Sequence, residues 1–188
     1  PFFLLAIFLA VDSRIDVLIL SYYRPTTEVG AYSAMTTLLG IAYIIPEGMR
    51  NAIFPAMSRY KKRGREELIN SVSLFVRYTV ILLAPFTVVF FFYVDHIVKL
   101  VFGSGYTDTA ALLQISIWSL VSYALTIIFS RLLIIEKHEK ILVWISIGSS
   151  ILTLVLNVVL VKRIGLMAVS IVKLVTSLVL MIALLVVM

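Results

Sequence analysis

Cysteine is absent from this 188-residue sequence, and histidine occurs only at His96 and His138. The absence of cysteine excludes a disulfide framework, a thiolate metal site and a cysteine nucleophile. The two histidines do not have the spacing of a metal site. The chain also lacks the phosphate-binding loop GxxxxGK(S/T) and the hydrolytic motifs HExxH and GxSxG, which indicate nucleotide hydrolysis, zinc proteases and serine hydrolases. We therefore expect neither an enzyme nor a metal or cofactor site.

Charged side chains are also scarce, at 14% of the residues against about 25% in soluble proteins. Apolar residues reach 62%, and the mean hydropathy is +1.10. A soluble core cannot absorb this excess, so much of the surface must face lipid. The net charge of +6 then fits basic loops on one side of a membrane better than nucleic-acid binding.

Long apolar runs divide the sequence. A helix needs about 20 residues to cross a hydrocarbon core of about 30 Å, and six segments are that long. They are 1–23, 31–57, 68–94, 109–135, 140–161 and 164–188. The sequence therefore predicts an all-α integral membrane protein with six transmembrane helices. It begins at Pro1 without methionine and ends in an apolar run, so we expect residues 1–188 to be a single transmembrane lobe cut from a longer chain.

Two basic loops decide the predicted orientation. The segment 58–67 contains five Lys and Arg residues and 136–140 contains two, whereas the other side has four. Because basic loops stay in the cytoplasm, we expect both segments to be cytoplasmic and the protein to lie in the cytoplasmic (inner) cell membrane. A basic run such as 58–67 also fits a nucleic-acid patch. Between two spans it is instead a topology signal that can touch anionic lipid.

Three predicted spans carry a stripe of small and hydroxylated residues at helical spacing. The stripes are Ser33, Thr37 and Gly40; Ser119, Ser122, Thr126 and Ser130; and Ser146, Ser150, Thr153 and Asn157. Such faces allow close helix packing and interhelical hydrogen bonds. The alternative is that some of them line a water-filled cavity.

Charged residues also occur inside the predicted spans. Each one costs about 2.5–3.5 kcal/mol at the centre of a bilayer, so these residues must face one another or water. They are Asp12, Arg14, Asp16, Glu47, Arg50, Arg77, Arg131 and Lys173. Arg77 and Lys173 are each about nine residues into their spans, which predicts a position near the bilayer midplane. We interpret these two as cavity residues, with structural pairing as the alternative.

The other charges have more local interpretations. Asp12 and Asp16 share a helix face, with Arg14 roughly opposite. Glu47 and Arg50, three residues apart, are expected to form an intrahelical pair. Arg131 is expected to extend to the nearby interface. Five bases against three acids leave the interior basic, and a basic cavity suits an anionic cargo such as phosphate or pyrophosphate.

The order of several segments resembles a known family. They are RIDVLILSYYRPTTEVGAYSAM at 14–35, IPEGMRNAIFPAMSRYKKRGREEL at 45–68, VKLVFGSGYTDTAALLQISIW at 98–118 and LNVVLVKRIGLMAVSI at 156–171. This series resembles the C-terminal half of the polysaccharide (O-antigen type) flippases of the multidrug/oligosaccharidyl-lipid/polysaccharide exporter superfamily, and it covers the whole chain. The chain departs from the family pattern at Val161 and Ala168, where the family often has proline and glycine.

The resemblance implies one lobe of a two-lobe transporter. Such a protein would move undecaprenyl-pyrophosphate-linked oligosaccharide across the membrane by alternating access, for surface polysaccharide biosynthesis. It implies headgroup contact for Arg14, Arg77 and Lys173, and coupling to H⁺ or Na⁺ at Asp12 or Asp16. Structural or secondary roles are left for Glu47, Arg50 and Arg131. The implied partners are the lipid-linked saccharide, membrane lipid and other polysaccharide-assembly proteins, without nucleic acid.

Two other functions stay open. A drug/cation antiporter of the same superfamily predicts an acidic, aromatic-lined cavity, against which the basic balance argues. A membrane enzyme of polysaccharide assembly predicts a long extracytoplasmic loop with catalytic residues. The longest such connection here, 95–108, is short for that task.

Overall fold

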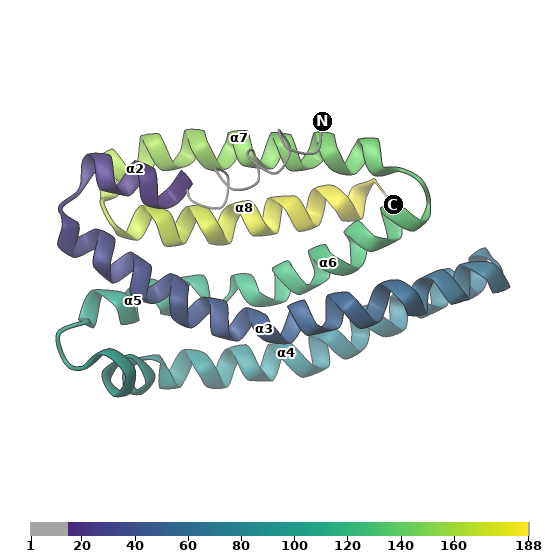
Figure 1. Cartoon of the computed structure of the whole chain (residues 1–188), viewed down its shortest axis with the longest axis horizontal. Coiled ribbons are helices and arrows are strands. Elements are labelled where there is room, and N and C mark those ends of the chain that lie inside the picture. Colours follow the sequence, from purple (N-terminus) through teal and green to yellow (C-terminus); the bar gives the residue numbers. More distant parts are fainter. Residues whose placement is uncertain (1–14, 188) are drawn as a thin grey trace.

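A computed structural model describes residues 15–187, and these residues form helices joined by short turns. The helices are α2 (Ile15–Tyr23), α3 (Thr26–Arg63), α4 (Arg65–Phe102), α5 (Thr107–Ser116), α6 (Ser119–Ile135), α7 (Glu139–Ile164) and α8 (Met167–Val186). No strand occurs between residues 15 and 187. The long helices run side by side in one bundle (Figure 1), in agreement with the all-α prediction.

Four helices of this part are long and apolar enough to cross a membrane: α3, α4, α7 and α8. The predicted span at 109–135 is not one continuous helix, because α5 ends at Ser116, α6 begins at Ser119 and the two are bent by 42°. If this bent pair is one span, the number rises to five. The predicted span at 1–23 falls largely outside the described residues, which include its last part as α2.

Helices α3 and α4 extend well beyond the predicted spans. Each has 38 residues, which makes about 57 Å at about 1.5 Å per residue. The connections that the predicted spans leave at 24–30 and 58–67 are therefore mostly helical, and the predicted span ends there were wrong. Pro25 stands directly before α3, where its missing N–H costs little. The Lys/Arg run that follows has good helix propensity and ends only at Gly64, whose φ of 133° disfavours any residue with a side chain.

The turns of the chain gather at two ends of the bundle (Figure 1). We name the end with the α3–α4 and α6–α7 turns the Gly64 end, and the end with the α2–α3, α4–α5 and α7–α8 turns the Gly165 end. At the Gly64 end, Lys61 Nζ donates to the carbonyl of Ile135 at 2.6 Å and lies 3.7 Å from Glu136 Oε1. The predicted basic loops therefore lie at the same end, as alternating spans require. The side of the membrane that they face stays a prediction.

Two apolar clusters fill the interior. The larger one lies toward the Gly165 end and contains fully buried side chains of α2 to α8, such as Leu20 and Met35. The second lies toward the Gly64 end, where α3, α4, α6 and α8 meet around Met57, Ile128 and Leu184. The two clusters hold the helices together toward both ends of the bundle.

Much of the outer surface of α4 and α7 is apolar. Helix α7 buries only Asn157 and Val161, and its outer face carries large side chains such as Trp144, which is 73% exposed. Helix α4 exposes Phe92 to 71% and Leu100 to 87%. Exposed apolar side chains of this size suit contact with lipid or with another membrane helix.

Candidate functional site

A polar cluster joins α2, α3 and α7 within the larger apolar cluster. The carboxylate of Asp16 accepts a hydrogen bond on each oxygen, from Asn157 Nδ2 at 2.7 Å and from the Tyr32 hydroxyl at 2.9 Å. Asn157 and Tyr32 are fully buried, and Asp16 is half-buried. Hydrogen bonds to an ionised group are the stronger kind, so the two donors fix the carboxylate in one orientation.

The surrounding contacts hold this cluster in place. Thr109 Oγ1 donates to the carbonyl of Ala31 at 3.0 Å, which fastens α5 to α3 beside Tyr32. The side-chain oxygen of Asn157 is buried and has no hydrogen-bond partner among the described residues. The cluster thus combines one carboxylate with two neutral oxygens, those of Tyr32 and Asn157. Hard oxygen atoms of this type suit a proton or a small cation.

A divalent metal site is not built into the described residues. Between residues 15 and 187, no three His, Asp or Glu side chains are grouped so that they could hold a metal ion. Between residues 15 and 187, the Asp16 cluster has one acidic side chain. The ion-coupling role of Asp16 stays a prediction.

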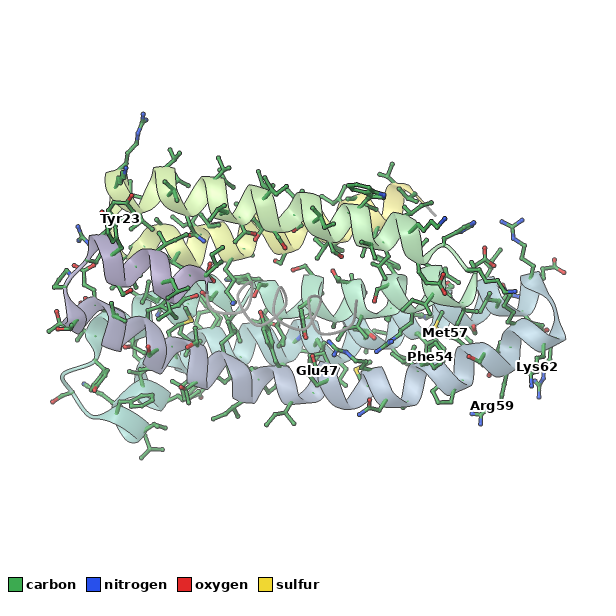
Figure 2. The ribbon with its side chains drawn as sticks, turned by 45° about the horizontal axis from the view of Figure 1, so that its top comes forward. Tyr23, Glu47, Phe54, Met57, Arg59 and Lys62 are labelled. Atoms are coloured by element: carbon green, nitrogen blue, oxygen red, sulfur yellow. The ribbon has the colours of Figure 1, made fainter. Side chains whose placement is uncertain are left out.

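A second polar cluster lies between α3 and α6, near the middle of α3 (Glu47 in Figure 2). Glu47 and Arg50 form the predicted intrahelical pair, with Arg50 Nη2 2.8 Å from Glu47 Oε1. The Tyr123 hydroxyl donates to Glu47 Oε1 and accepts from Arg50 Nη2 at 3.0 Å. Tyr123 stacks on Tyr43 with ring centroids 4.5 Å apart, and the Tyr43 hydroxyl lies 2.7 Å from Ser119 Oγ. The pair is thus the polar end of a network between two helices.

Arg77 lies on an exposed face of α4. Asn70 and Ser73, which share this face, are exposed as well. Arg77 follows Arg65 by 12 positions and precedes Phe102 by 25, which places it about 10 Å from the middle of α4 toward the Gly64 end. Because α4 extends beyond the predicted span at both ends, the middle of this helix does not mark the bilayer midplane. The predicted depth of Arg77 stays a prediction.

Lys173 lies in the first half of α8 and is half-buried. Helices α7 and α8 form a hairpin around Gly165, with Asn157 eight residues before this glycine and Lys173 eight residues after it. The hairpin therefore places Lys173 at about the same depth as the Asp16 cluster. The ion pairs found among the described residues do not include Lys173.

The structure does not bring Arg77 and Lys173 together. Helix α6 packs against both α4 and α8, so it separates the two side chains. Arg131, also on α6, is half-buried, and its guanidinium lies 5.6 Å from the ring centroid of Phe54, a cation–π contact near the Gly64 end. Asp12 and Arg14 lie outside the described residues, so their predicted roles stay predictions.

The three predicted stripes have different surroundings. Ser33, Thr37 and Gly40 form an exposed face of α3. On α6, Ser122 hydrogen-bonds Ser177 of α8 with 2.9 Å between the hydroxyl oxygens, which confirms that this stripe allows close helix packing. On α7, Asn157 is the buried member of its stripe.

Sequence reasoning missed the tyrosines of both clusters. Tyr43 stands four residues before Glu47, so helical spacing could have placed the two on one face. Tyr32 and Asp16 are 16 residues apart and on different helices. Tyr123 and Glu47 are 76 residues apart, and no local pattern predicts that contact.

The apolar helices, with polar clusters between them, define a multi-pass helical membrane protein. The chain matches the MatE family over residues 1–159, and because this match covers most of its length, the chain belongs to the MatE family. It is 24% identical over 160 residues to the probable low-salt glycan biosynthesis flippase Agl15 of Haloferax volcanii. The match covers 85% of this chain and 34% of the relative, so the chain spans about a third of the length of the curated relative. No solved structure gives a significant match.

Proposed function

We propose that this chain is one lobe, the C-terminal one, of a six-span-per-lobe flippase for lipid-linked oligosaccharide. The cargo would be an oligosaccharide on undecaprenyl pyrophosphate, moved across the cytoplasmic membrane by alternating access during surface polysaccharide biosynthesis. The observation that carries this proposal is the likeness to a glycan biosynthesis flippase over 85% of the chain. Membership of the MatE family supports transport rather than covalent chemistry.

The physical task of such a protein explains its polar interior. A sugar–pyrophosphate headgroup cannot cross hydrocarbon unaided, because removing a charge from water without compensation costs tens of kcal/mol in an apolar medium. A path with fixed polar and basic groups replaces the water around the headgroup, while the lipid tail remains in the bilayer. The half-buried Lys173, at the depth of the Asp16 cluster, supplies a basic group where such a path needs one.

Lys173 is therefore our first candidate for headgroup contact. It has no acidic partner within ion-pair distance in residues 15–187, so its ammonium is available to an anion. Arg77 and Arg14 are further candidates by charge. Arg77 faces outward from α4 and is separated from Lys173 by α6. For this reason we assign it to a stage of transport nearer the Gly64 end.

Asp16 is our candidate for ion coupling. Its carboxylate, the Tyr32 hydroxyl and the unpartnered Asn157 oxygen provide ligands for one H⁺ or Na⁺. Binding of a cation would replace the hydrogen bonds that now join α2 to α3 and α7. Because these bonds connect three helices, their exchange for an ion would couple ion binding to helix movement.

The test uses the full-length protein and measures the transfer of lipid-linked glycan to the outer leaflet. We expect Lys173→Gln to lower the rate about tenfold or more, which is the effect of losing a charge-assisted contact of about 1.5–3 kcal/mol, and Lys173→Arg to retain most of it. Arg163→Gln is the matched control. Arg163 is exposed at the Gly165 end, so its substitution removes one positive charge and leaves the interior unchanged. Parental rates for Lys173→Gln at normal abundance would show that the assignment is wrong.

One observation favours the drug/cation antiporter instead. The stacked Tyr43 and Tyr123 beside Glu47 are the acidic and aromatic group that this alternative predicts, since aromatic faces and a carboxylate bind organic cations. If Glu47→Gln abolishes efflux of a cationic dye and leaves glycan transfer unchanged, the antiporter is the better description. If the parent protein exports no cationic dye and Glu47→Gln lowers glycan transfer, the flippase is the better description.

A further inference from the structure

An amphipathic groove lies at the Gly64 end, between the start of α4 and the end of α6. Its volume is about 210 Å³, and its lining residues are Arg65, Leu68, Ile69, Val72, Leu132 and Glu136. The four apolar residues form the walls, and the two charged residues stand at the end of the groove nearest the turns. The groove thus has the polarity of an amphiphilic ligand, with a charged mouth and an apolar body.

The mouth of the groove is positively charged. Glu136 is offset by Lys61, whose Nζ lies 3.7 Å from Glu136 Oε1. Arg65 is exposed and takes part in no ion pair or hydrogen bond found among the described side chains. One guanidinium therefore remains available at the mouth, and guanidinium binds phosphate in a bidentate manner.

The two acidic residues next to Arg65 face away from the groove. The α4 residues that line it follow helical spacing, at positions 65, 68, 69 and 72. Successive residues turn by about 100° around a helix of 3.6 residues per turn, so Glu66 and Glu67 lie on other faces. The side chains of Arg59 and Lys62 also project away from the bundle (Figure 2), where they attract anions to this end without lining the groove.

The groove lies at the depth of the membrane–water interface. On α7, Lys140 and Lys162 are 22 residues apart, about 33 Å at about 1.5 Å per residue, which brackets a hydrocarbon core of about 30 Å. Lys140 follows Glu136 by four residues across the α6–α7 turn. The mouth therefore sits level with lipid headgroups, and Leu68, Val72 and Leu132 extend inward along the acyl chains.

We propose that this groove binds an anionic phospholipid as a resident ligand, with its phosphate at Arg65 and one acyl chain along the walls. Basic pockets between membrane helices recognise headgroups of this type. A free phosphate ion would use the arginine but not the apolar walls, and a neutral lipid would use the walls but not the arginine. A lipid in this position joins α4 to α6 beside the second apolar cluster, so it stabilises the Gly64 end whatever the transported substrate is.

The test counts bound lipid on the full-length protein by native mass spectrometry, in detergent micelles with equal amounts of phosphatidylglycerol and phosphatidylcholine. We expect a phosphatidylglycerol molecule to be retained in preference to phosphatidylcholine, and Arg65→Gln to lower its affinity about tenfold, as the loss of one charge-assisted contact does. Arg63→Gln is the matched control. It removes the same charge two residues away, from a side chain that lies 5.7 Å from the Tyr60 ring and outside the groove, and should retain the lipid.

A second variant tests the walls. Leu132→Trp fills the groove without changing charge, and we expect it to lower phosphatidylglycerol retention while the protein still elutes as one species. If Arg63→Gln and Arg65→Gln lower phosphatidylglycerol retention equally, the whole basic turn attracts the lipid diffusely and the proposed site is wrong. Displacement of the lipid by millimolar inorganic phosphate, or full retention in both Arg65→Gln and Leu132→Trp, would overturn it too.

Discussion

Tyr32→Phe removes one hydroxyl from the Asp16 cluster and leaves the buried ring in place. Tyr32 is 1% exposed, so phenylalanine fills the same space and the apolar packing is retained. The hydroxyl donates to Asp16 Oδ2 at 2.9 Å, and a hydrogen bond to a charged group contributes about 1.5–3 kcal/mol. We expect the substitution to lower the free energy of unfolding by about this amount. The assay is a dodecyl sulfate titration of the purified full-length protein.

A double-mutant cycle separates the hydrogen bond from other effects of the substitution. In an Asp16→Asn background the same hydroxyl meets a neutral oxygen, for which about 0.5–1.5 kcal/mol is typical. In this background, Tyr32→Phe should therefore lower the free energy of unfolding by about 1 kcal/mol less than in the parent protein. This difference is a coupling energy within the usual range of about 0.5–3 kcal/mol for residues in contact.

Tyr78→Phe is the control for this experiment. Tyr78 is 65% exposed and makes no hydrogen bond found among the described side chains, so its loss should change stability by less than about 0.5 kcal/mol. If Tyr32→Phe lowers the free energy of unfolding by the same amount with Asp16 and with Asp16→Asn, the argument that the hydroxyl stabilises the carboxylate is refuted.

Two further predictions concern the turns and the topology. Gly165 has φ 68° and ψ −144°, a backbone conformation that residues with a side chain rarely adopt, so Gly165→Ala should lower the free energy of unfolding by about 1–3 kcal/mol. Gly148→Ala, with nothing within 4 Å of the added Cβ, should not lower it. Cysteines placed singly at Ser58 and Ser104, in a chain without native cysteine, should be labelled from opposite sides of the membrane. Labelling from the same side would contradict the alternation of ends.

Much of the fold could be predicted because it depends on local properties. Apolar runs long enough to cross a bilayer predicted the all-α class, and α3, α4, α7 and α8 confirm it. The Glu47–Arg50 pair was also predicted, since residues three apart on a helix are neighbours whatever surrounds them. The helix ends were predicted less well. Hydropathy measures where lipid begins, whereas a helix continues through polar residues until a glycine such as Gly64 or Gly103 ends it.

The candidate sites depended more on tertiary structure. Asn157 and Asp16 are 141 residues apart. The sequence placed Asn157 on a polar stripe and Asp16 on a helix face with Asp12, with no indication that Asn157 and Asp16 meet. Charge and depth marked Arg77 and Lys173 as a pair lining one cavity wall. Their helices, α4 and α8, both pack against α6, an arrangement that the sequence did not predict because the position of a helix among its neighbours is not encoded in the spacing of its own residues.

The sequence by itself determined that this protein lies in a membrane as a bundle of helices, and that its interior contains charges which lipid would reject. These conclusions follow from composition and from helical periodicity, which act within a few residues of the chain. Only the tertiary structure decided which charges have partners. It places Asp16 with Tyr32 and Asn157 and joins Glu47 to Tyr123, whereas Arg65 and Lys173 take part in none of the ion pairs found between residues 15 and 187. The physical reason is that contacts between helices depend on their rotation and register, which the packing of the whole bundle sets.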